Sequence, residues 1–506
     1  MPALNRTELI VFLAFVSLGL ANILSHEMWR DEFQAFLIAK ESVSLPDLFE
    51  RTRYEGHPPL WFLSLFAITR FTADPLAMQI FHLMIACASA LLILKLPAPG
   101  WLRYPLVFGY FTVYEYLALS RNYSMGLLFC LILLRLMTAE RRDHALIALV
   151  LFVLCFTSVY GLILAAAIGF YVVLDSGFPT RNVRPAAAVS LVLLAGLGLS
   201  AAITLPPPDS AVDTAQWFFS FDVTRAARVL TAIWKSYVPV PELNAHFWDT
   251  HLLESRPLRV VVSLLILIGS MLIFIPKRNV FLFFCFGTFS LFIFSYFKFV
   301  GYLRHQGHFF IVFMMCLILM CRGGARPFKI TARAFVIAIL ALQIFAGAAA
   351  SVLGWMHPFT AAKAAARYIK TQGFDDYFIM GDRDYALTSL SGYLGQPVFH
   401  LASMKFGTYI VWNRERTREL EPREIAAYAN RVAAGQNRRA LVALNYPLPP
   451  GETGNLVKVA EFTRSIKKDE TYFLYMIGNT LEADIKKRSF LESGNPVFEF
   501  PDPRDE

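Results

Sequence analysis

Long runs of apolar residues, separated by short basic turns, constrain this sequence more than any other feature. The runs cover residues 8–25, 58–72, 76–96, 101–119, 122–138, 144–158, 159–175, 185–204, 257–276, 279–296, 306–321 and 330–353. A helix needs about 20 apolar residues to cross the hydrocarbon core of a membrane, and several runs have that length. We therefore expect an all-α bundle that crosses a membrane many times.

Composition supports this class and excludes others. Of the 506 residues, 56% are hydrophobic and 17% are charged, whereas soluble proteins have roughly 45–50% apolar and about 25% charged residues. The net charge of +9 comes from basic residues clustered between the runs, so it does not indicate nucleic-acid binding. The six cysteines lie within apolar runs without metal-type spacing, which indicates buried free thiols. No small-residue cleavage pattern follows the first run, so we expect an uncleaved span.

Lys and Arg residues in the turns predict the orientation of the bundle. The turns are Arg135/Arg141/Arg142, Arg181/Arg184, Lys277/Arg278 and Arg322/Arg326/Lys329. The positive-inside rule assigns them to the cytoplasm, so loop 206–256, the stretch 297–305 and everything after residue 354 face outward. If all twelve runs crossed the membrane, the C-terminus would return to the cytoplasm, which conflicts with the basic turns. We therefore expect 11 or 13 true crossings. The run 58–72 is the suspect, because it is short and contains Arg70.

We do not expect two parts of the chain to span the membrane. Loop 206–256 is long for a connector, and long loops are usually functional. After residue 354, helix-like segments at 361–371, 384–394 and 421–434 alternate with strand-like segments at 377–380, 398–401, 440–445, 456–462 and 471–476. That alternation is typical of a small α/β domain. We predict a transmembrane domain over 1–354, with outer loops 26–57 and 206–256, and an extracytoplasmic α/β domain over 355–506.

The first outer loop carries the acidic pair Asp31-Glu32. The pair directly precedes an amphipathic stretch, 33–49, which suits a helix lying along the membrane interface. Carboxylates at the edge of a bilayer are costly and tend to be functional. The alternative is that the pair belongs to an ordinary solvated loop.

Two further groups of charged residues are predicted at the same outer face. Glu115 lies within or at the end of one run and Arg121 precedes the next, so they either serve a site or form an ion pair between helix ends. Arg304 and His308 are four residues apart and share a helix face, which makes a plausible anion clamp. The alternative for this face is contact with lipid headgroups.

Four short motifs resemble the GT-C superfamily of polyprenyl-phosphate-sugar-dependent glycosyltransferases, of the protein O-mannosyltransferase or aminoarabinose transferase type. The motifs are Trp29-Arg30-Asp31-Glu32, Tyr54-Glu55-Gly56-His57-Pro58-Pro59-Leu60, the stretch from Glu115 to Tyr123, and Arg304-His305-Gln306-Gly307-His308. They cover the membrane portion up to about residue 320, and the region after 354 carries no motif of this kind.

The resemblance implies a role for each matched residue. Asp31 would take the proton from the acceptor hydroxyl, and Glu32 would orient acceptor or donor. Glu55, His57, Glu115 and Arg121 would bind donor or acceptor, and Arg304, His305 and His308 would hold the lipid phosphate. Relatives sometimes hold a divalent metal ion near the second acid, so Asp31 and Glu115 are the possible ligands. Here that second acid is Glu rather than Asp, which leaves the metal in doubt.

The expected function is an inverting glycosyltransferase at the outer face of a bacterial cytoplasmic membrane. It would move a sugar from polyprenyl phosphate to a glycan, lipid or protein acceptor, with membrane lipid as its other partner. A phosphate leaving group needs little protonation, so one base and a set of cations suffice. A flippase for lipid-linked sugars would share the cations, but it predicts paired halves that the sequence does not show. A non-catalytic scaffold gives no reason for the acidic pair.

Overall fold

The computed structural model describes residues 3–177, 183–211, 217–323, 328–415, 420–436 and 439–478. They form two compact units. The first comprises Met1–Ala361, Tyr409–Arg416 and Arg464–Glu470, and the second comprises Ala362–Thr408, Thr417–Thr463 and Thr471–Glu506. The predicted boundary at 354/355 lies near the first of these limits. The sequence did not predict that two later segments belong to the first unit.

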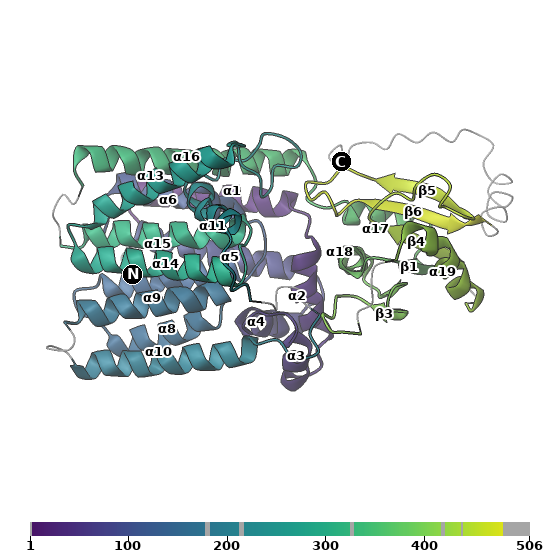
Figure 1. Ribbon diagram of the computed structural model, residues 1–506, viewed down its shortest axis with the longest axis horizontal. Coiled ribbons are helices and arrows are strands. Elements are labelled where there is room, and N and C mark those ends of the chain that lie inside the picture. The colour runs from purple at the N-terminus through teal and green to yellow at the C-terminus, as the bar shows by residue number, and fades with distance from the viewer. Residues whose placement is uncertain are drawn as a thin grey trace. The chain divides into compact units, whose positions relative to one another are not determined.

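The first unit is a bundle of helices, whose long members run side by side in Figure 1. Its elements are α1 (Arg6–Ser25), α2 (Arg30–Glu41), α3 (Leu45–Thr52), α4 (Leu60–Thr69), α5 (Leu76–Leu94), α6 (Gly100–Val107), the π-helix η1 (Phe111–Glu115), α7 (Tyr123–Met137), α8 (His144–Cys155), α9 (Val159–Asp175), α10 (Val183–Thr204), α11 (Val223–Leu230), α12 (Ala232–Tyr237), α13 (Arg256–Phe274), α14 (Arg278–Phe297), α15 (Leu303–Cys321) and α16 (Ile330–Met356). The predicted all-α bundle is thus present.

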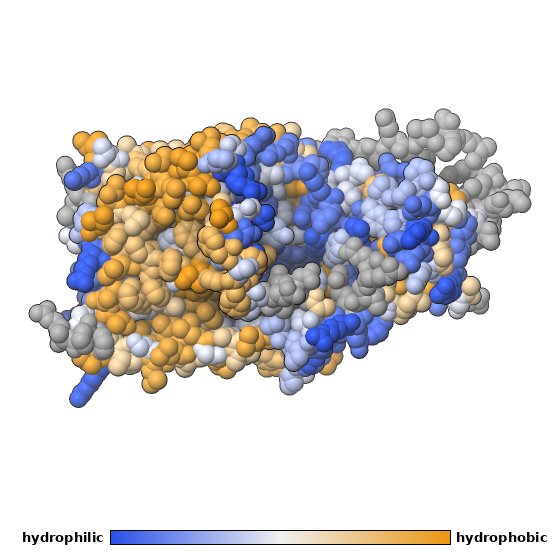
Figure 2. Space-filling view, viewed as in Figure 1, coloured by the Kyte–Doolittle hydropathy of each residue, from blue (hydrophilic) through white to orange (hydrophobic). Residues whose placement is uncertain are grey.

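Seven helices in the described part of the chain are long and apolar enough to cross a membrane: α1, α5, α10, α13, α14, α15 and α16. Figure 2 shows apolar side chains spread over the helices of this unit. Exposed apolar residues such as Leu191 and Leu265 cannot be explained by a protein core, and they suit contact with lipid. The chain is a multi-pass membrane protein.

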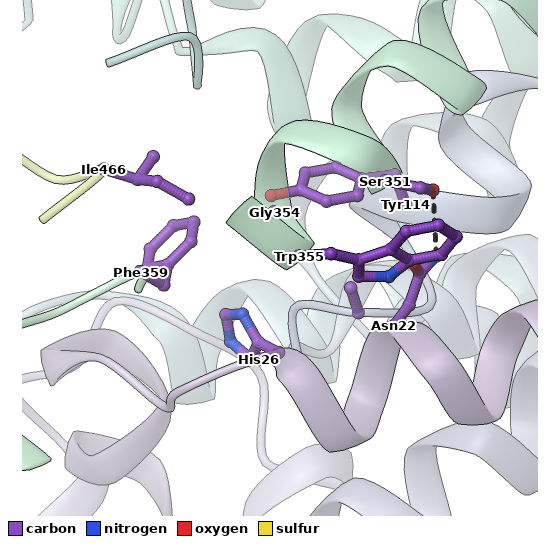
Figure 3. A pocket seen from close by; sticks show the side chains of 9 residues that line it. Asn22, His26, Tyr114, Ser351, Gly354, Trp355, Phe359 and Ile466 are labelled. Carbon is purple, nitrogen blue, oxygen red and sulfur yellow. Dashed lines mark hydrogen bonds between the residues drawn. The ribbon is translucent and has the colours of Figure 1, made fainter. Parts of the chain in front are cut away.

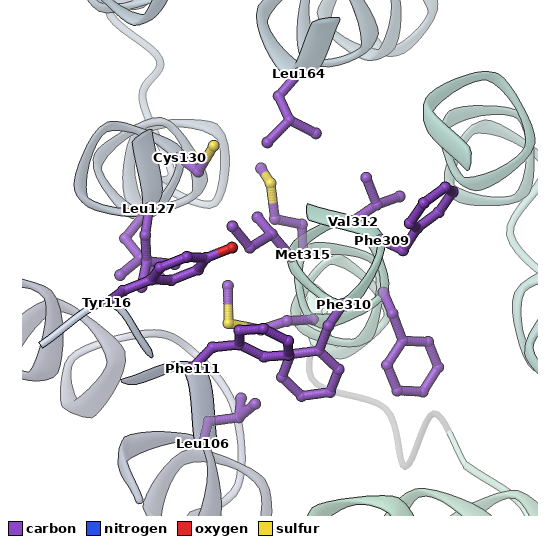
Figure 4. Close-up of a cluster of buried hydrophobic side chains, with 14 of the residues drawn as sticks. Leu106, Phe111, Tyr116, Leu127, Cys130, Leu164, Phe309, Phe310, Val312 and Met315 are labelled. Carbon is purple, nitrogen blue, oxygen red and sulfur yellow. The ribbon is translucent and has the colours of Figure 1, made fainter. Parts of the chain in front are cut away.

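Helix α15 lies at the centre of the bundle. In its apolar window, 94% of the residues are buried, against 28% for α10 and α13. Figure 4 shows Phe310 and Met315 of α15 among Phe111, Tyr116 and Leu127. Because α15 is held on all sides, residues at its start are fixed in position relative to the neighbouring helices.

The suspected run 58–72 is the short helix α4. Its 10 residues span about 15 Å, half the thickness of a hydrocarbon core. The backbone N–H of Leu60 donates to the carbonyl oxygen of Phe156, which follows α8. This run is therefore not a simple crossing.

The basic turns gather at one end of the bundle. Asp175 at the end of α9 accepts hydrogen bonds from Arg142, before α8, and from Arg322, after α15. Lys277 donates to the carbonyl oxygens of Met320 and Arg322. Turns far apart in the sequence thus lie together, as their predicted placement on one side requires. Arg181 and Arg326 of the predicted turns lie outside the described residues.

The second unit contains a six-stranded mixed sheet in the order β3-β2-β1-β4-β6-β5. Its elements are α17 (Ala362–Thr371), β1 (Phe378–Gly381), α18 (Asp384–Leu394), β2 (Val398–His400), β3 (Lys405–Gly407), α19 (Pro422–Ala434), β4 (Ala440–Leu444), β5 (Leu456–Phe462) and β6 (Tyr472–Ile477). Strand β1 pairs in parallel with β2 and β4, and the remaining pairs are antiparallel. The predicted α/β unit is present within its described residues, and β3 was not predicted.

Candidate functional site

The loop after α1 forms two helices rather than one. The amphipathic stretch 33–49 breaks at Ser42-Val43-Ser44, where α2 ends and Ser44 caps α3 by accepting the backbone N–H of Asp47. Side chains of α2 such as Phe33 and Phe36 are buried within the protein. The expectation of one continuous helix is therefore wrong, and α2 packs against α4. Its position along the membrane interface stays a prediction.

Asp31 lies in the first turn of α2, beside two arginines from distant parts of the chain. Its Oδ2 is 3.1 Å from Nη2 of Arg304 and 3.9 Å from Nη1 of Arg121. Arg121 also donates to the backbone carbonyl oxygen of Asp31. Burial would raise the pKa of the Asp31 carboxyl, but Arg121, Arg304 and Arg30 outweigh burial and hold that pKa below its usual value. Asp31 is therefore ionised at neutral pH.

Glu32 points away from Asp31 and into the protein. Its side chain is fully buried, and its carboxylate accepts hydrogen bonds from the backbone N–H groups of Trp29 and Ser120 at 3.1 and 2.6 Å. Nε2 of His26 lies 2.7 Å from the same carboxylate. These bonds tie the start of α2 to the loop that carries Arg121. Both carboxylate oxygens of Glu32 thus have protein partners, which suits this residue to positioning, and its predicted substrate-orienting role stays a prediction.

Glu55 and His57 lie close enough to Asp31 and Arg121 for their charges to interact. Gln34 donates to Oε1 of Glu55 at 2.8 Å. Burial raises the pKa of Glu55 to about 7, against the opposing effect of that bond. Burial and the positive charge of Arg121 lower the pKa of His57 to about 3. His57 is thus neutral, and of these two groups Glu55 titrates near neutral pH.

The two arginines retain hydrogen-bonding capacity. Within the described residues, Nε of Arg121, Nε of Arg304 and Nδ1 of His57 are buried without a protein partner. Buried guanidinium groups normally pair with anions through several N–H groups at once. The arrangement is therefore suited to an additional anion with more than one acceptor oxygen.

Aromatic rings hold Arg304 in place. Its guanidinium lies 5.5 Å from the ring centroids of both Trp29 and Trp248, and the two indoles meet edge to face at 5.1 Å. Cation–π contact restricts the guanidinium without occupying its N–H groups. Arg304 can therefore donate to an anion from a fixed position.

Asp249 is a site residue that the sequence did not single out. It has a positive φ of 63°, which is uncommon for a non-glycine residue, and its Oδ1 accepts the backbone N–H of Leu303 at 2.7 Å. That bond satisfies a donor at the start of α15, next to Arg304. Burial raises the pKa of Asp249, although the Leu303 bond and nearby cations oppose it. Only its place in the long outer loop hinted at a role.

His305 and His308 face the interior of the bundle. The backbone N–H of Tyr302 donates to Nδ1 of His305, so Nε2 carries the proton and donates to the Tyr123 hydroxyl at 2.8 Å. His308 lies 2.8 Å from the carbonyl oxygen of His305 through Nδ1 and stacks on Tyr160. Of the three predicted phosphate ligands, Arg304 is the one beside Asp31.

One alternative predicted an ion pair between Glu115 and Arg121, but Glu115 has other partners. Its Oε2 accepts from the Tyr110 hydroxyl at 2.7 Å and from Nε1 of Trp248 at 3.2 Å. Glu115 thus supports one of the indoles that hold Arg304. In the described part of the chain, no group of three or more His, Cys, Asp or Glu residues gathers as a metal-binding set.

A small pocket lies between α1, α16 and the segment 464–470. Asn22, His26, Trp355, Phe359 and Ile466 contribute to its walls, as Figure 3 shows. It has room for about one water molecule, so it cannot hold a sugar. The charged cluster around Asp31, rather than this pocket, is the candidate site.

No protein-family profile matches the chain, and a comparison with curated proteins finds no significant match. The resemblance to GT-C glycosyltransferases therefore stays a prediction, which depends on the residues described above.

Proposed function

We propose that this protein is an inverting glycosyltransferase of the GT-C type, which uses a polyprenyl-phosphate-linked sugar. The observation that carries the proposal is the carboxylate of Asp31 between Arg121 and Arg304, with buried guanidinium N–H groups left over. A transferase of this kind needs a base for the acceptor and cations for the departing phosphate within one site. Both are supplied here by three separate segments of the chain.

In the proposed reaction, Asp31 accepts the proton of the acceptor hydroxyl. The hydroxyl oxygen forms a bond to the anomeric carbon from the face opposite the phosphate. The bond from that carbon to the phosphate oxygen breaks, and its electron pair stays on the phosphate. Attack opposite the leaving group inverts the anomeric centre, by the same geometry as in inverting glycosidases.

The Asp31–Arg304 ion pair gives the donor a way to activate the base. While Arg304 pairs with Asp31, the carboxylate is ionised but weakly basic. A phosphate bound by Arg304 and Arg121 would compensate their charge, so the pKa of Asp31 would rise toward its usual value. A base with a higher pKa takes a proton more readily, so donor binding would prepare Asp31 for the acceptor.

We further propose an orientation with the site at the outer face of a bacterial cytoplasmic membrane. The described helices give eleven crossings if α1, α5, α6 with η1, α7 to α10 and α13 to α16 each cross once. An odd number places the two ends of the transmembrane domain on opposite sides of the membrane, and the basic turns then assign the N-terminus to the inside and the α/β unit to the outside.

The test compares glycans and lipids of a deletion strain carrying either the wild-type gene or Asp31→Asn, by mass spectrometry. We expect the loss of one sugar unit from an acceptor in the deletion strain. Wild type should restore it, and Asp31→Asn should not, although the variant protein accumulates normally. Restoration by Asp31→Asn would exclude Asp31 as the base. An unchanged profile with lipid-linked sugar accumulating inside would favour a transporter.

A further inference from the structure

Segment 464–470 lies in the chain between strands β5 and β6, but it belongs to the first unit. It pairs with the chain that follows α16. Backbone N–H groups of Ile466 and Lys467 donate to the carbonyl oxygens of Pro358 and Phe359 at 2.8 and 3.1 Å. The N–H of Ala361 donates to Glu470 at 2.9 Å. The position of Lys467 is therefore set by backbone hydrogen bonds on both sides.

The same segment is bonded to the residue next to the candidate base. The buried carboxylate of Glu470 accepts the backbone N–H of Arg30 at 3.3 Å and the hydroxyl of Thr360 at 2.8 Å. Asp469 forms an ion pair with Arg30 at 2.8 Å. Arg30 directly precedes Asp31, so these contacts connect segment 464–470 to the start of α2.

Lys467 shares its aromatic support with Arg304. Its ammonium lies 5.9 Å from the ring centroid of Trp29 and 5.7 Å from that of Trp248, the two indoles that also contact the Arg304 guanidinium. The ammonium is 3.3 Å from Asp469, and 28% of the side chain remains accessible. Two cations are thus held against one pair of rings, beside Asp31.

Two cations held this close repel each other, and an anion that contacts both would relieve the repulsion. An ammonium has three N–H donors, and the contact with Asp469 accounts for one of them. The charge of Lys467 also acts on Asp31 and Asp249, which places it electrostatically within the site. A phosphate monoester or diester has the several acceptor oxygens that such a pair of cations requires.

We propose that Lys467 binds the phosphate of the lipid-linked donor together with Arg304, so that segment 464–470 is a phosphate-binding loop. This inference rests on the proposed function for the identity of the donor. It assigns a binding residue to a part of the chain in which the sequence showed no usable motif. The segment between β5 and β6 would then be required for donor binding.

The test measures binding of geranylgeranyl phosphate to the full-length protein in lipid nanodiscs, with geranylgeraniol as the uncharged control. Lys467→Met keeps the unbranched stem against the indoles and removes the charge. We expect it to weaken phosphate binding by at least about tenfold, as the loss of one charge-assisted hydrogen bond predicts. Binding of the alcohol should not change, and Lys467→Arg should restore most of the phosphate affinity.

Lys468 provides the matched control, because it carries the same charge one residue away and is exposed. Lys468→Met should bind both ligands like the wild type. Equal phosphate affinity in Lys467→Met and Lys468→Met would overturn the proposal, and so would an equal loss for phosphate and alcohol. Lys467→Gln serves as a second neutral variant if Lys467→Met does not fold.

The two proposals fail in different ways. Binding is measured without turnover, so a loss of phosphate affinity in Lys467→Met would support the loop even if Asp31→Asn kept its activity. In the transfer reaction, Lys467→Met should raise the KM for the donor by about tenfold and leave kcat nearly unchanged. A fall in kcat with constant KM would contradict the binding role.

Discussion

Two clusters of the same composition lie at opposite ends of the bundle. At one end Asp175 contacts Arg142 and Arg322, and at the other Asp31 contacts Arg121 and Arg304. Asp175 accepts direct hydrogen bonds from both of its arginines. Asp31 has one contact at 3.1 Å and one at 3.9 Å. An aspartate between two arginines therefore does not by itself distinguish a structural cluster from a site.

The surroundings make the difference. Asp175 accepts hydrogen bonds from both Arg142 and Arg322 and so joins two turns of the chain. Around Asp31, the described residues include buried arginine N–H groups without a protein acceptor and a pair of indoles that fix one arginine. The unpartnered arginine N–H groups leave capacity for an additional anion, and the indoles hold Arg304 in place for it.

The largest expected difference follows from neutralising each aspartate. Asp31→Asn should lower the rate of sugar transfer by about 10²–10⁴-fold, because it removes the general base. Asp175→Asn should leave the rate nearly unchanged and lower the free energy of unfolding by about 1–3 kcal/mol, because two arginines lose their acceptor. Transfer assays and thermal unfolding of both purified variants check this. Equal losses of activity would remove the distinction between the two clusters.

Substitution of Arg304 should lower activity more than substitution of Arg322, by a smaller factor than the two aspartates show. Arg304→Lys should lower kcat/KM for the donor by about 10²-fold, because an ammonium cannot present the forked N–H groups of a guanidinium. Arg322→Lys should keep its activity, since a single donor to Asp175 is enough at that end. Steady-state kinetics with varied donor concentration check both. Normal kinetics in Arg304→Lys would exclude bidentate phosphate recognition by this residue.

Sequence patterns predicted the parts of this structure that depend on local chemistry. The apolar runs predicted the helical bundle, and alternating segments after 354 predicted the described helices and all strands except β3. The spacing of Arg304 and His308 correctly placed them on one helix, but it did not show which way that face turns. His308 packs inside the bundle, and α15 is buried on nearly every side.

Contacts between distant segments could not be predicted. The bond from Arg304 to Asp31 joins residues that are 273 positions apart, and Lys467 reaches the site from a loop between two strands. No local pattern distinguishes Lys467 from Lys468, because burial decides which of them matters. The sequence also did not predict that His26, Trp29 and Ser120 would contact the carboxylate of Glu32.

Glu32 and Glu8 are two buried carboxylates in separate clusters, and they extend the comparison between a site and a structural cluster. Glu8 at the N-terminal end of α1 pairs with Lys95 and Arg103 at 2.6 and 3.1 Å. Glu32→Gln should lower stability by about 1–3 kcal/mol, because its amide group would meet an N–H donor. It should also lower the transfer rate by about tenfold, because the Arg121 loop loses its anchor. Glu8→Gln should lower stability alone. Full activity in Glu32→Gln would contradict the positioning role.

The smallest predicted effect is a pH dependence of donor binding that belongs to Glu55. The pKa of Glu55 is raised to about 7, whereas that of His57 is about 3 and that of Asp31 is below its usual value. Of these three groups, only Glu55 therefore titrates between pH 5 and 8. Below pH 7 it is protonated and neutral, and above pH 7 its negative charge opposes binding of an anionic donor.

The KM for the donor should consequently rise several-fold as the pH increases through about 7, and Glu55→Gln should flatten this rise. The measurement is a profile of donor KM from pH 5 to 8.5 for the wild type, Glu55→Gln and the control Glu50→Gln. Glu50 is an exposed carboxylate that pairs with Arg53 outside the cluster, so its variant should keep the wild-type profile. A rise in KM that persists in Glu55→Gln would assign the titration to another group.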